Sequence, residues 1–346
     1  MPKNIVICLD GTGNQLEAKG NTNVVRVFEM LDLSDPAKQI GYYDPGVGTF
    51  SAAGAWTPLA RYLSRLFGLV FGSGLRTNLA EVFKFLIQNY ECGDRVFVFG
   101  FSRGAFTARA LTGLLRLVGL PRPGSENLVP YAIGMYTRNR HLSEEDWQQV
   151  HRFAAAFARP IGKGTGVPIT YVGIWDSVKA ARVHWPYTRD LDKVMRVRHA
   201  VAIDEKRRPY REYLVTPMPK ATQRLEELWF AGVHSDVGGG FEDEHPLSQI
   251  SLKWIVDAAV EEQLLVKPTA YRKACAVTPE NIDGPVHGMG WVWALLTYRR
   301  RLVPNGASVH ASVRDRADYA DRYQPRMPAD VLWEDGSEEF PRPART

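Results

Sequence analysis

The sequence lacks the features that mark secreted, membrane-spanning and nucleic-acid-binding proteins. Its 346 residues include only Cys8, Cys92 and Cys275, an odd number spread far apart, which excludes a disulfide framework. No apolar run approaches the roughly 20 residues that a membrane-spanning helix needs. There is no RNP-like motif, zinc finger or long basic run, so nothing in the sequence indicates a nucleic-acid partner.

The N-terminus has no signal-peptide architecture, because Met1–Asn4 runs directly into an apolar segment. We therefore expect cytoplasmic synthesis without a membrane span, and cysteines kept reduced. The net charge of +5 and the pI of about 9.0 are mild. This surplus is compatible with an anionic membrane surface or an anionic substrate.

With 45% hydrophobic and 23% charged residues, the chain is long enough and apolar enough for one large core. We predict a single α/β-hydrolase domain over residues 1–325, with a mostly parallel sheet and helices on both faces. Helical insertions are expected around 50–74 and 121–166, followed by an irregular tail over 326–346.

Strand-like apolar segments alternate with amphipathic helical ones along the chain. We expect strands at 4–9, 39–43, 95–99, 168–175 and 225–233, and helices at 23–33, 73–90, 105–120 and 246–261. In a parallel sheet, functional sites form at the carboxyl ends of the strands. Four expected strands are followed by residues whose side chains can take part in catalysis: Asp10, Ser102, Asp176 and His234.

The pentapeptide GFSRG at residues 100–104 lies between an expected strand and an expected helix. A G-x-S-x-G in this context is typical of the nucleophile elbow of α/β-hydrolases. The serine occupies a strained turn, and glycines two residues before and after it permit the close approach of strand and helix. Ser102 is therefore the candidate nucleophile.

A serine nucleophile needs a base, and the base needs an orienting group. The chain order Ser, Asp, His favours Ser102, Asp176 and His234, with His234 as general base and Asp176 orienting it. One alternative stays open at this point: Asp236 orients a later base, His310.

The oxyanion hole requires two backbone donors. The N–H of Arg103, directly after the nucleophile, is one candidate. The loop after the first strand, at Gly11 and Thr12, supplies the other, and Asp10 is expected to hold that loop in shape.

Two hydrophobic segments are candidates for controlling substrate access. Residues 50–74 form either a buried helix or a lid beside the site. The second segment, residues 291–298, is rich in aromatics and precedes Arg299–Arg301, which suits either an ordinary core helix or contact with anionic lipid headgroups.

Several motifs together resemble those of the DUF2235 hydrolases, which include the Tle1-type phospholipase effectors of type VI secretion systems. They are LDGTGN at 9–14, GFSRGA at 100–105, WDSV at 175–178, HAVAIDE at 199–205 and WFAGVHSDVGGG at 229–240. The resemblance implies an α/β-hydrolase fold, lipase-like ester hydrolysis and the triad Ser102, Asp176 and His234. For an effector, it also implies export by a type VI secretion system, with secretion and immunity partners.

The hypothesis is a serine ester hydrolase that acts on a lipid or another acyl ester through an acyl-enzyme, without cofactor or metal, and with peripheral membrane contact. One rival is a metal-dependent phosphoesterase using Asp10, Asp176, His234 and Asp236. The other is a catalytically inactive hydrolase fold used for binding.

Overall fold

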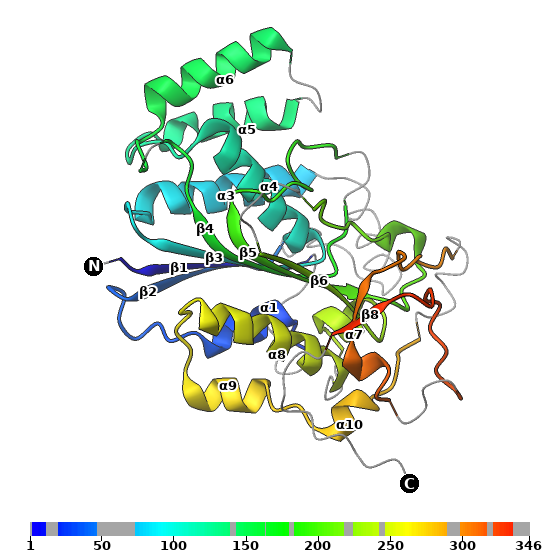
Figure 1. Cartoon of the computed structure of the whole chain (residues 1–346). Coiled ribbons are helices and arrows are strands. Elements are labelled where there is room, and N and C mark those ends of the chain that lie inside the picture. Colours follow the sequence, from blue (N-terminus) through cyan, green and yellow to red (C-terminus); the bar gives the residue numbers. More distant parts are fainter. Residues whose placement is uncertain are drawn as a thin grey trace, which may run out of the picture.

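The computed structural model describes residues 2–11, 20–46, 73–138, 143–162, 164–179, 183–217, 224–241, 246–288, 298–316 and 321–334. In these ranges the chain forms an eight-stranded sheet in the order β2-β1-β3-β4-β5-β6-β7-β8 (Figure 1). Every neighbouring pair of strands in this order is parallel. The fold is therefore the α/β architecture that the alternating pattern predicts.

The strands are β1 (Asn4–Leu9), β2 (Gln39–Asp44), β3 (Arg95–Phe101), β4 (Ile169–Trp175), β5 (Val194–Ala202), β6 (Arg224–Phe230), β7 (Ser308–His310) and β8 (Leu332–Glu334). The longer helices are α1 (Asn23–Met30), α3 (Ser73–Asn89), α4 (Arg103–Val118), α5 (Val129–Arg138), α6 (Glu144–Phe157) and α8 (Pro246–Glu261). Shorter helices are α7 (His234–Gly238), α9 (Pro268–Ala274) and α10 (Pro279–Ile282).

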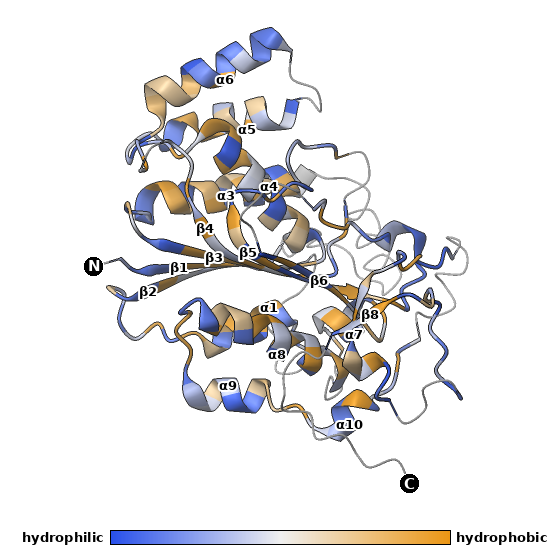
Figure 2. Cartoon of the chain, viewed as in Figure 1, coloured by the Kyte–Doolittle hydropathy of each residue, from blue (hydrophilic) through white to orange (hydrophobic). Residues whose placement is uncertain are grey.

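Helices cover both faces of the sheet. In Figure 1, α3 to α6 lie above it, with α6 farthest away, and α1, α8, α9 and α10 lie below. Figure 2 shows these helices as mixtures of hydrophobic and hydrophilic residues. Apolar residues such as Val24 and Val27 of α1 are buried, as expected for helices that pack on a sheet.

Most of the core lies in two apolar layers, one on each face of the sheet, and a smaller cluster lies around β7. Successive residues of β1 alternate between the two layers: Ile5 and Ile7 belong to the layer under α3 and α4, and Val6 and Cys8 to the layer against α1 and α8. All six residues of β1 are buried. This two-sided burial explains why the strand is an uninterrupted apolar run in the sequence.

Strand β5 is a part of the sheet that the sequence patterns did not predict. Arg196 and Arg198 interrupt the apolar pattern of this strand, and both side chains are buried. Glu226 on the neighbouring strand β6 pairs with both arginines, at 2.9 and 3.0 Å. These cross-strand pairs compensate charges that would otherwise be too costly to bury.

The prediction of an irregular tail over 326–346 is wrong for Leu332–Glu334, which pairs with β7 as the edge strand β8. Helices α5 and α6 occupy the segment 121–166, as expected. Most of the expected access segment 50–74 lies outside the described residues. Among the helices that the structure describes, none is both long and apolar enough to cross a bilayer.

The strand order reverses at β1, because β2 lies on one side of it and β3 on the other. Ligands of open parallel sheets bind beyond the carboxyl ends of the strands at such a switch point. Asp10 follows β1 and Ser102 follows β3, and Leu9 and Gly100 are aligned at the ends of these strands. The topology thus brings the serine turn to the position where a site is expected.

Helix α4 begins in close contact with β1, and this contact depends on Gly104. A Cβ added there would lie 2.0 Å from the carbonyl oxygen of Leu9, whereas one at Gly134 within α5 would meet nothing within 4 Å. We expect Gly104→Ala to lower the free energy of unfolding by at least about 2 kcal/mol, because β1 and α4 must move apart.

The matched control, Gly134→Ala, should be neutral or stabilising by up to about 1 kcal/mol, since alanine is the better helix former. Urea unfolding followed by circular dichroism measures both variants. Equal effects of the two substitutions would contradict the close packing at Gly104.

Candidate active site

Ser102 occupies the sharp turn between β3 and α4. Its backbone has φ 59° and ψ −119°, a conformation that residues other than glycine rarely adopt. The Ser102 hydroxyl does not cap the helix that follows. The Ser102 N–H donates to the carbonyl of Trp175 at 3.1 Å, and the Ser102 carbonyl accepts from Val178 at 3.3 Å. The turn is therefore fastened to the residues on either side of Asp176.

The glycines of the pentapeptide have the steric role that the motif predicts. A Cβ at Gly100 would lie 2.7 Å from the carbonyl oxygen of Gly104, so neither this position nor position 104 tolerates a side chain. The sharp turn raises Ser102 at the sheet edge, and α4 starts directly behind it.

Asp176 follows β4 directly and is 1% exposed. Its Oδ1 accepts hydrogen bonds from the Ala202 N–H at 2.9 Å and from Arg301 Nη1 at 2.5 Å. Its Oδ2 accepts from His234 Nδ1 at 2.5 Å and from Arg301 Nη2 at 2.9 Å. The carboxylate is thus buried and held by donors from three separate segments.

Burial alone would raise the pKa of Asp176, but the Arg301 guanidinium and the hydrogen bond from His234 outweigh it. The net effect holds the pKa of Asp176 well below its ordinary value. Arg301, 4% exposed, forms a bidentate ion pair with the carboxylate. Asp176 is therefore ionised at neutral pH.

His234 is the first residue of α7, which begins after the short turn that follows β6. Its ring lies 4.5 Å from the ring of Phe101, the residue before Ser102, and 4.8 Å from the ring of Tyr210. Burial lowers the pKa of His234, and the interaction with Asp176 opposes this only in part. The ring is neutral at pH 7, with Nδ1–H donating to Asp176.

Close packing keeps α7 against the serine turn. A Cβ at Gly238 would lie 2.0 Å from the Phe101 ring. The structure therefore joins His234 to Asp176 and packs its ring against Phe101, the residue before Ser102.

A second buried histidine supports the Asp176 turn. His199, in β5, accepts at Nε2 from the Ser177 N–H at 3.2 Å and donates from Nδ1 to Glu227 at 2.7 Å. Burial lowers the pKa of His199, which keeps the ring neutral and able to make both bonds. Sequence reasoning gave His199 no role in the site; its place in HAVAIDE was the available signal for this supporting role.

The alternative pair of Asp236 and His310 is not formed. Asp236 accepts from His287 Nδ1 at 2.5 Å and from the Val233 N–H at 2.9 Å. His310 contacts the Ser312 hydroxyl at 2.8 Å and stacks on Phe230.

Asp236 instead braces the turn before α7, as its hydrogen bond from Val233 indicates. Burial lowers the pKa of His310 to about 3. The buried environment of His310 therefore matches a core histidine.

Of the three residues expected to supply oxyanion donors, the structure describes Gly11 and Arg103. The Gly11 N–H donates to the Asp10 carboxylate at 2.7 Å, so in this geometry it is committed to shaping the loop. Asp10 also accepts from the Thr22 hydroxyl at 2.6 Å. Thr12 lies outside the described residues. Arg103 is the first residue of α4, at the end of the helix that carries the positive pole of its dipole.

Of the four residues of the rival metal site, only Asp176 and His234 bond to each other. Asp10 is bound to Thr22, Asp176 to Arg301 and Asp236 to His287. Within the described ranges, no three His, Cys, Asp or Glu side chains gather closely enough to hold a metal ion.

The aromatic part of the basic segment, residues 291–297, lies outside the described residues. Sequence reasoning left open whether Arg299–Arg301 follows an ordinary core helix or contacts lipid headgroups. Arg301 is not available for lipid contact, because its guanidinium is buried on Asp176. Arg301 is thus a site residue that sequence reasoning missed, and only the local basic run drew attention to it.

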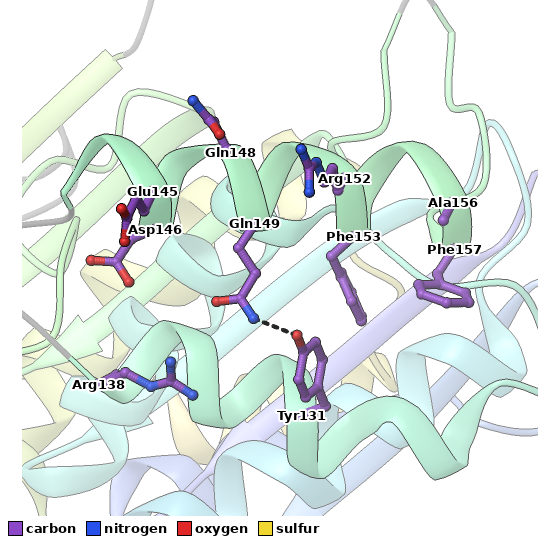
Figure 3. Close-up of a pocket in the computed structure, with 10 residues that line it drawn as sticks. All are labelled: Tyr131, Arg138, Glu145, Asp146, Gln148, Gln149, Arg152, Phe153, Ala156 and Phe157. Atoms are coloured by element: carbon purple, nitrogen blue, oxygen red, sulfur yellow. Dashed lines mark hydrogen bonds between the residues drawn. The ribbon is translucent and has the colours of Figure 1, made fainter.

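A cavity of about 780 Å³ lies between α5 and α6. Figure 3 shows Tyr131 of α5 pointing toward Gln149 of α6, with Phe153 beside it. None of the predicted site residues lines this cavity, so it plays no part in the site described above.

The parallel sheet, the strained serine turn and the Asp–His pair at the same edge define an α/β-hydrolase-like protein. The model of one family, described as "T6SS, Phospholipase effector Tle1-like, catalytic domain", matches residues 3–258. The chain belongs to this family.

A yeast protein, "Uncharacterized protein YEL023C" of Saccharomyces cerevisiae, is 32% identical over 226 residues, which cover 63% of this chain and 33% of the yeast protein. The chain therefore spans about a third of the length of the curated relative it matches. Two solved structures are more distantly similar, each at 18% identity.

One of these is an uncharacterized protein from Pseudomonas aeruginosa, with a TM-score of 0.45, covering 81% of this chain and 48% of that one. The other is the Tle1 effector bound to the VgrG spike from the Type 6 secretion system. Its TM-score is 0.36, and the match covers 69% of this chain and 51% of that one.

The Asp176–Arg301 pair makes a prediction about stability and pH. Because the folded-state pKa of Asp176 is lowered, the ionised carboxylate stabilises the fold above the unfolded-state pKa of about 3.9, and this contribution is lost as the pH falls through the folded-state pKa. We expect Arg301→Met to lower the free energy of unfolding at pH 7 by about 3–5 kcal/mol, because a buried charge loses its partner.

The deficit should shrink as the pH is lowered from 7 toward 4, because the Asp176 pKa rises in the variant and protonation then relieves the unpaired charge. Urea unfolding at several pH values measures this, with the exposed neighbour Arg299→Met as control. A deficit that does not change with pH would contradict the assigned pairing.

Proposed function

We propose that this protein is a serine ester hydrolase that acts on lipid esters, with Ser102 as nucleophile, His234 as general base and Asp176 as the orienting carboxylate. The main support is the 2.5 Å hydrogen bond between Asp176 and His234 at the sheet edge where Ser102 occupies a strained turn. Membership of a family described as phospholipase effectors supports the lipid substrate.

In the proposed mechanism, Ser102 Oγ attacks the ester carbonyl carbon while its proton moves to His234 Nε2. The tetrahedral intermediate collapses, and the C–O bond to the leaving alcohol breaks as His234 returns the proton to it. The acyl group then remains on Ser102. Water, deprotonated by His234, then attacks the acyl carbon; the bond from this carbon to Ser102 Oγ breaks, His234 returns the proton to Ser102 Oγ, and the carboxylic acid is released.

Asp176 has two tasks in this mechanism. It keeps the proton of neutral His234 on Nδ1, which leaves Nε2 unprotonated and able to act as the base. It also stabilises the imidazolium that forms. Arg301 keeps Asp176 ionised throughout. For the oxyanion we propose the Arg103 N–H at the start of α4, where the positive end of the helix favours developing negative charge.

The description of the family as effectors extends the proposal to export by a type VI secretion system, with a secretion partner and an immunity partner. Inactivation of the secretion system in the producing cell tests this. The protein should then disappear from the medium, and its continued presence there would contradict export by this route.

The roles of the three residues predict a pattern of kinetic losses. Ser102→Ala and His234→Ala should each lower kcat by several powers of ten, and the double variant should be little worse than either, because the residues act as one unit. His310→Ala should lose on the order of tenfold or less, as a buried residue that only shapes the surroundings. Hydrolysis of a soluble p-nitrophenyl ester by folded protein measures all four.

If His310→Ala is the inactive variant and His234→Ala keeps its activity, the assignment of the base is wrong. Circular dichroism of each variant separates lost chemistry from lost folding.

The environment of His234 also predicts a pH profile. A base must be neutral to accept a proton, and burial holds the pKa of His234 below its ordinary value of about 6.5. We therefore expect the acid limb of kcat/KM to fall below pH 6.5, with full activity retained at pH 7. An acid limb centred above pH 7 would argue against His234, in the environment described, as the base.

A further inference from the structure

Two basic segments that are distant in the sequence lie side by side next to the site. The Arg299 N–H donates to the Lys206 carbonyl at 2.7 Å, and Arg207 pairs with Tyr298 in an isolated bridge. Their arginines line one shallow recess: Arg207, Arg208 and Arg211 from one segment, and Arg299, Arg300 and Arg301 from the other. We call these six residues the arginine patch.

Positive charge is in excess at the arginine patch. Arg207 is paired with Glu205 at 2.6 Å and Arg301 with Asp176 at 2.5 Å, so the charges of these two arginines are compensated by carboxylates of the protein. Arg208, Arg299 and Arg300 are exposed, and none of them has a carboxylate within salt-bridge distance in the described part of the chain. Such a concentration of charge on a chain with a net charge of only +5 favours an anionic partner.

Apolar side chains flank the exposed arginines. Tyr298 is 44% exposed and Leu302 is 70% exposed, on either side of the run Arg299–Arg301. A free anion would gain nothing from these side chains. A lipid surface offers phosphates to the arginines and an apolar boundary to Tyr298 and Leu302 at the same time.

The arginine patch borders the proposed catalytic residues. Arg301 Nη2 donates to the Tyr210 carbonyl at 2.5 Å, and the Tyr210 ring lies edge-on to the His234 ring at 4.8 Å. A surface docked on the patch would therefore lie next to the site rather than on a remote face.

We propose that the exposed arginines of the arginine patch, with Tyr298 and Leu302, dock the protein on an anionic phospholipid surface and present lipid esters to Ser102. The link to catalysis rests on the proposed function, whereas the docking itself does not require hydrolysis. The lipid phosphates bind Arg208, Arg299 and Arg300, and Leu302 enters the interfacial layer.

The test measures binding to vesicles with the Ser102→Ala protein, so that hydrolysis does not change the lipid. Sedimentation compares pure phosphatidylcholine vesicles with mixed phosphatidylcholine–phosphatidylglycerol vesicles. We expect binding to the mixed vesicles only, weakened by added salt. Adding Arg208→Glu and Arg300→Glu should weaken it at least roughly twenty-five-fold, since each basic residue near such a surface contributes about fivefold.

The matched control reverses two exposed arginines outside the patch, Arg152→Glu and Arg272→Glu, and should bind almost as the parent does. Leu302→Ser should also weaken binding without changing the charge. Equal loss in the control, unchanged binding in the patch variant, or tighter binding to a single-stranded RNA than to the mixed vesicles would overturn the proposal.

Turnover of a soluble ester by the otherwise wild-type protein separates this proposal from the proposed function. Arg208→Glu with Arg300→Glu should leave that turnover unchanged. Specific vesicle binding by a protein that hydrolyses no ester would support the docking surface and contradict the proposed hydrolase. Ester turnover with no preference for anionic vesicles would do the reverse.

Discussion

The buried negative charge of Asp176 is the constraint on which the site depends. A carboxylate removed from water costs several kcal/mol unless it is paired and fully hydrogen-bonded. Three segments meet this requirement: β5 through the Ala202 N–H, α7 through His234, and the chain after residue 298 through Arg301. Because all three must reach one carboxylate, their positions at the sheet edge are coupled. The same coupling leaves His234 neutral, oriented and next to the serine turn.

Much of this arrangement could be predicted because it depends on local patterns and on the rules of parallel sheets. Apolar runs located β1, β3 and β4, and the residues that follow β3 and β4 proved to be the strained positions Ser102 and Asp176. The strand β5 escaped prediction because Arg196 and Arg198 interrupt its apolar pattern, and their partners, Glu226 on β6 and residues of α8, are distant in the sequence. The edge strand β8 was missed because three residues leave too short a pattern.

The partners of the site residues were harder to predict than the residues themselves. Arg301 is separated from Asp176 by 125 positions, and nothing in a run of three arginines distinguishes the buried one from the two exposed ones. Asp236 and His287 are likewise 51 positions apart. The Gly11 N–H, expected to face an oxyanion, is taken by the side chain of the preceding residue, Asp10. Such pairings depend on side-chain geometry that sequence periodicity does not carry.

The central claim is that Asp176 and His234 activate Ser102, and a fluorophosphonate probe tests it most directly. Such a probe reacts quickly only with an activated serine, and the adduct is located by mass spectrometry of proteolytic peptides. The account predicts one adduct, on Ser102, that forms on the order of a thousandfold or more slowly in Asp176→Asn, where the orienting carboxylate is lost. No adduct on Ser102, or equally fast labelling of Asp176→Asn, would contradict it.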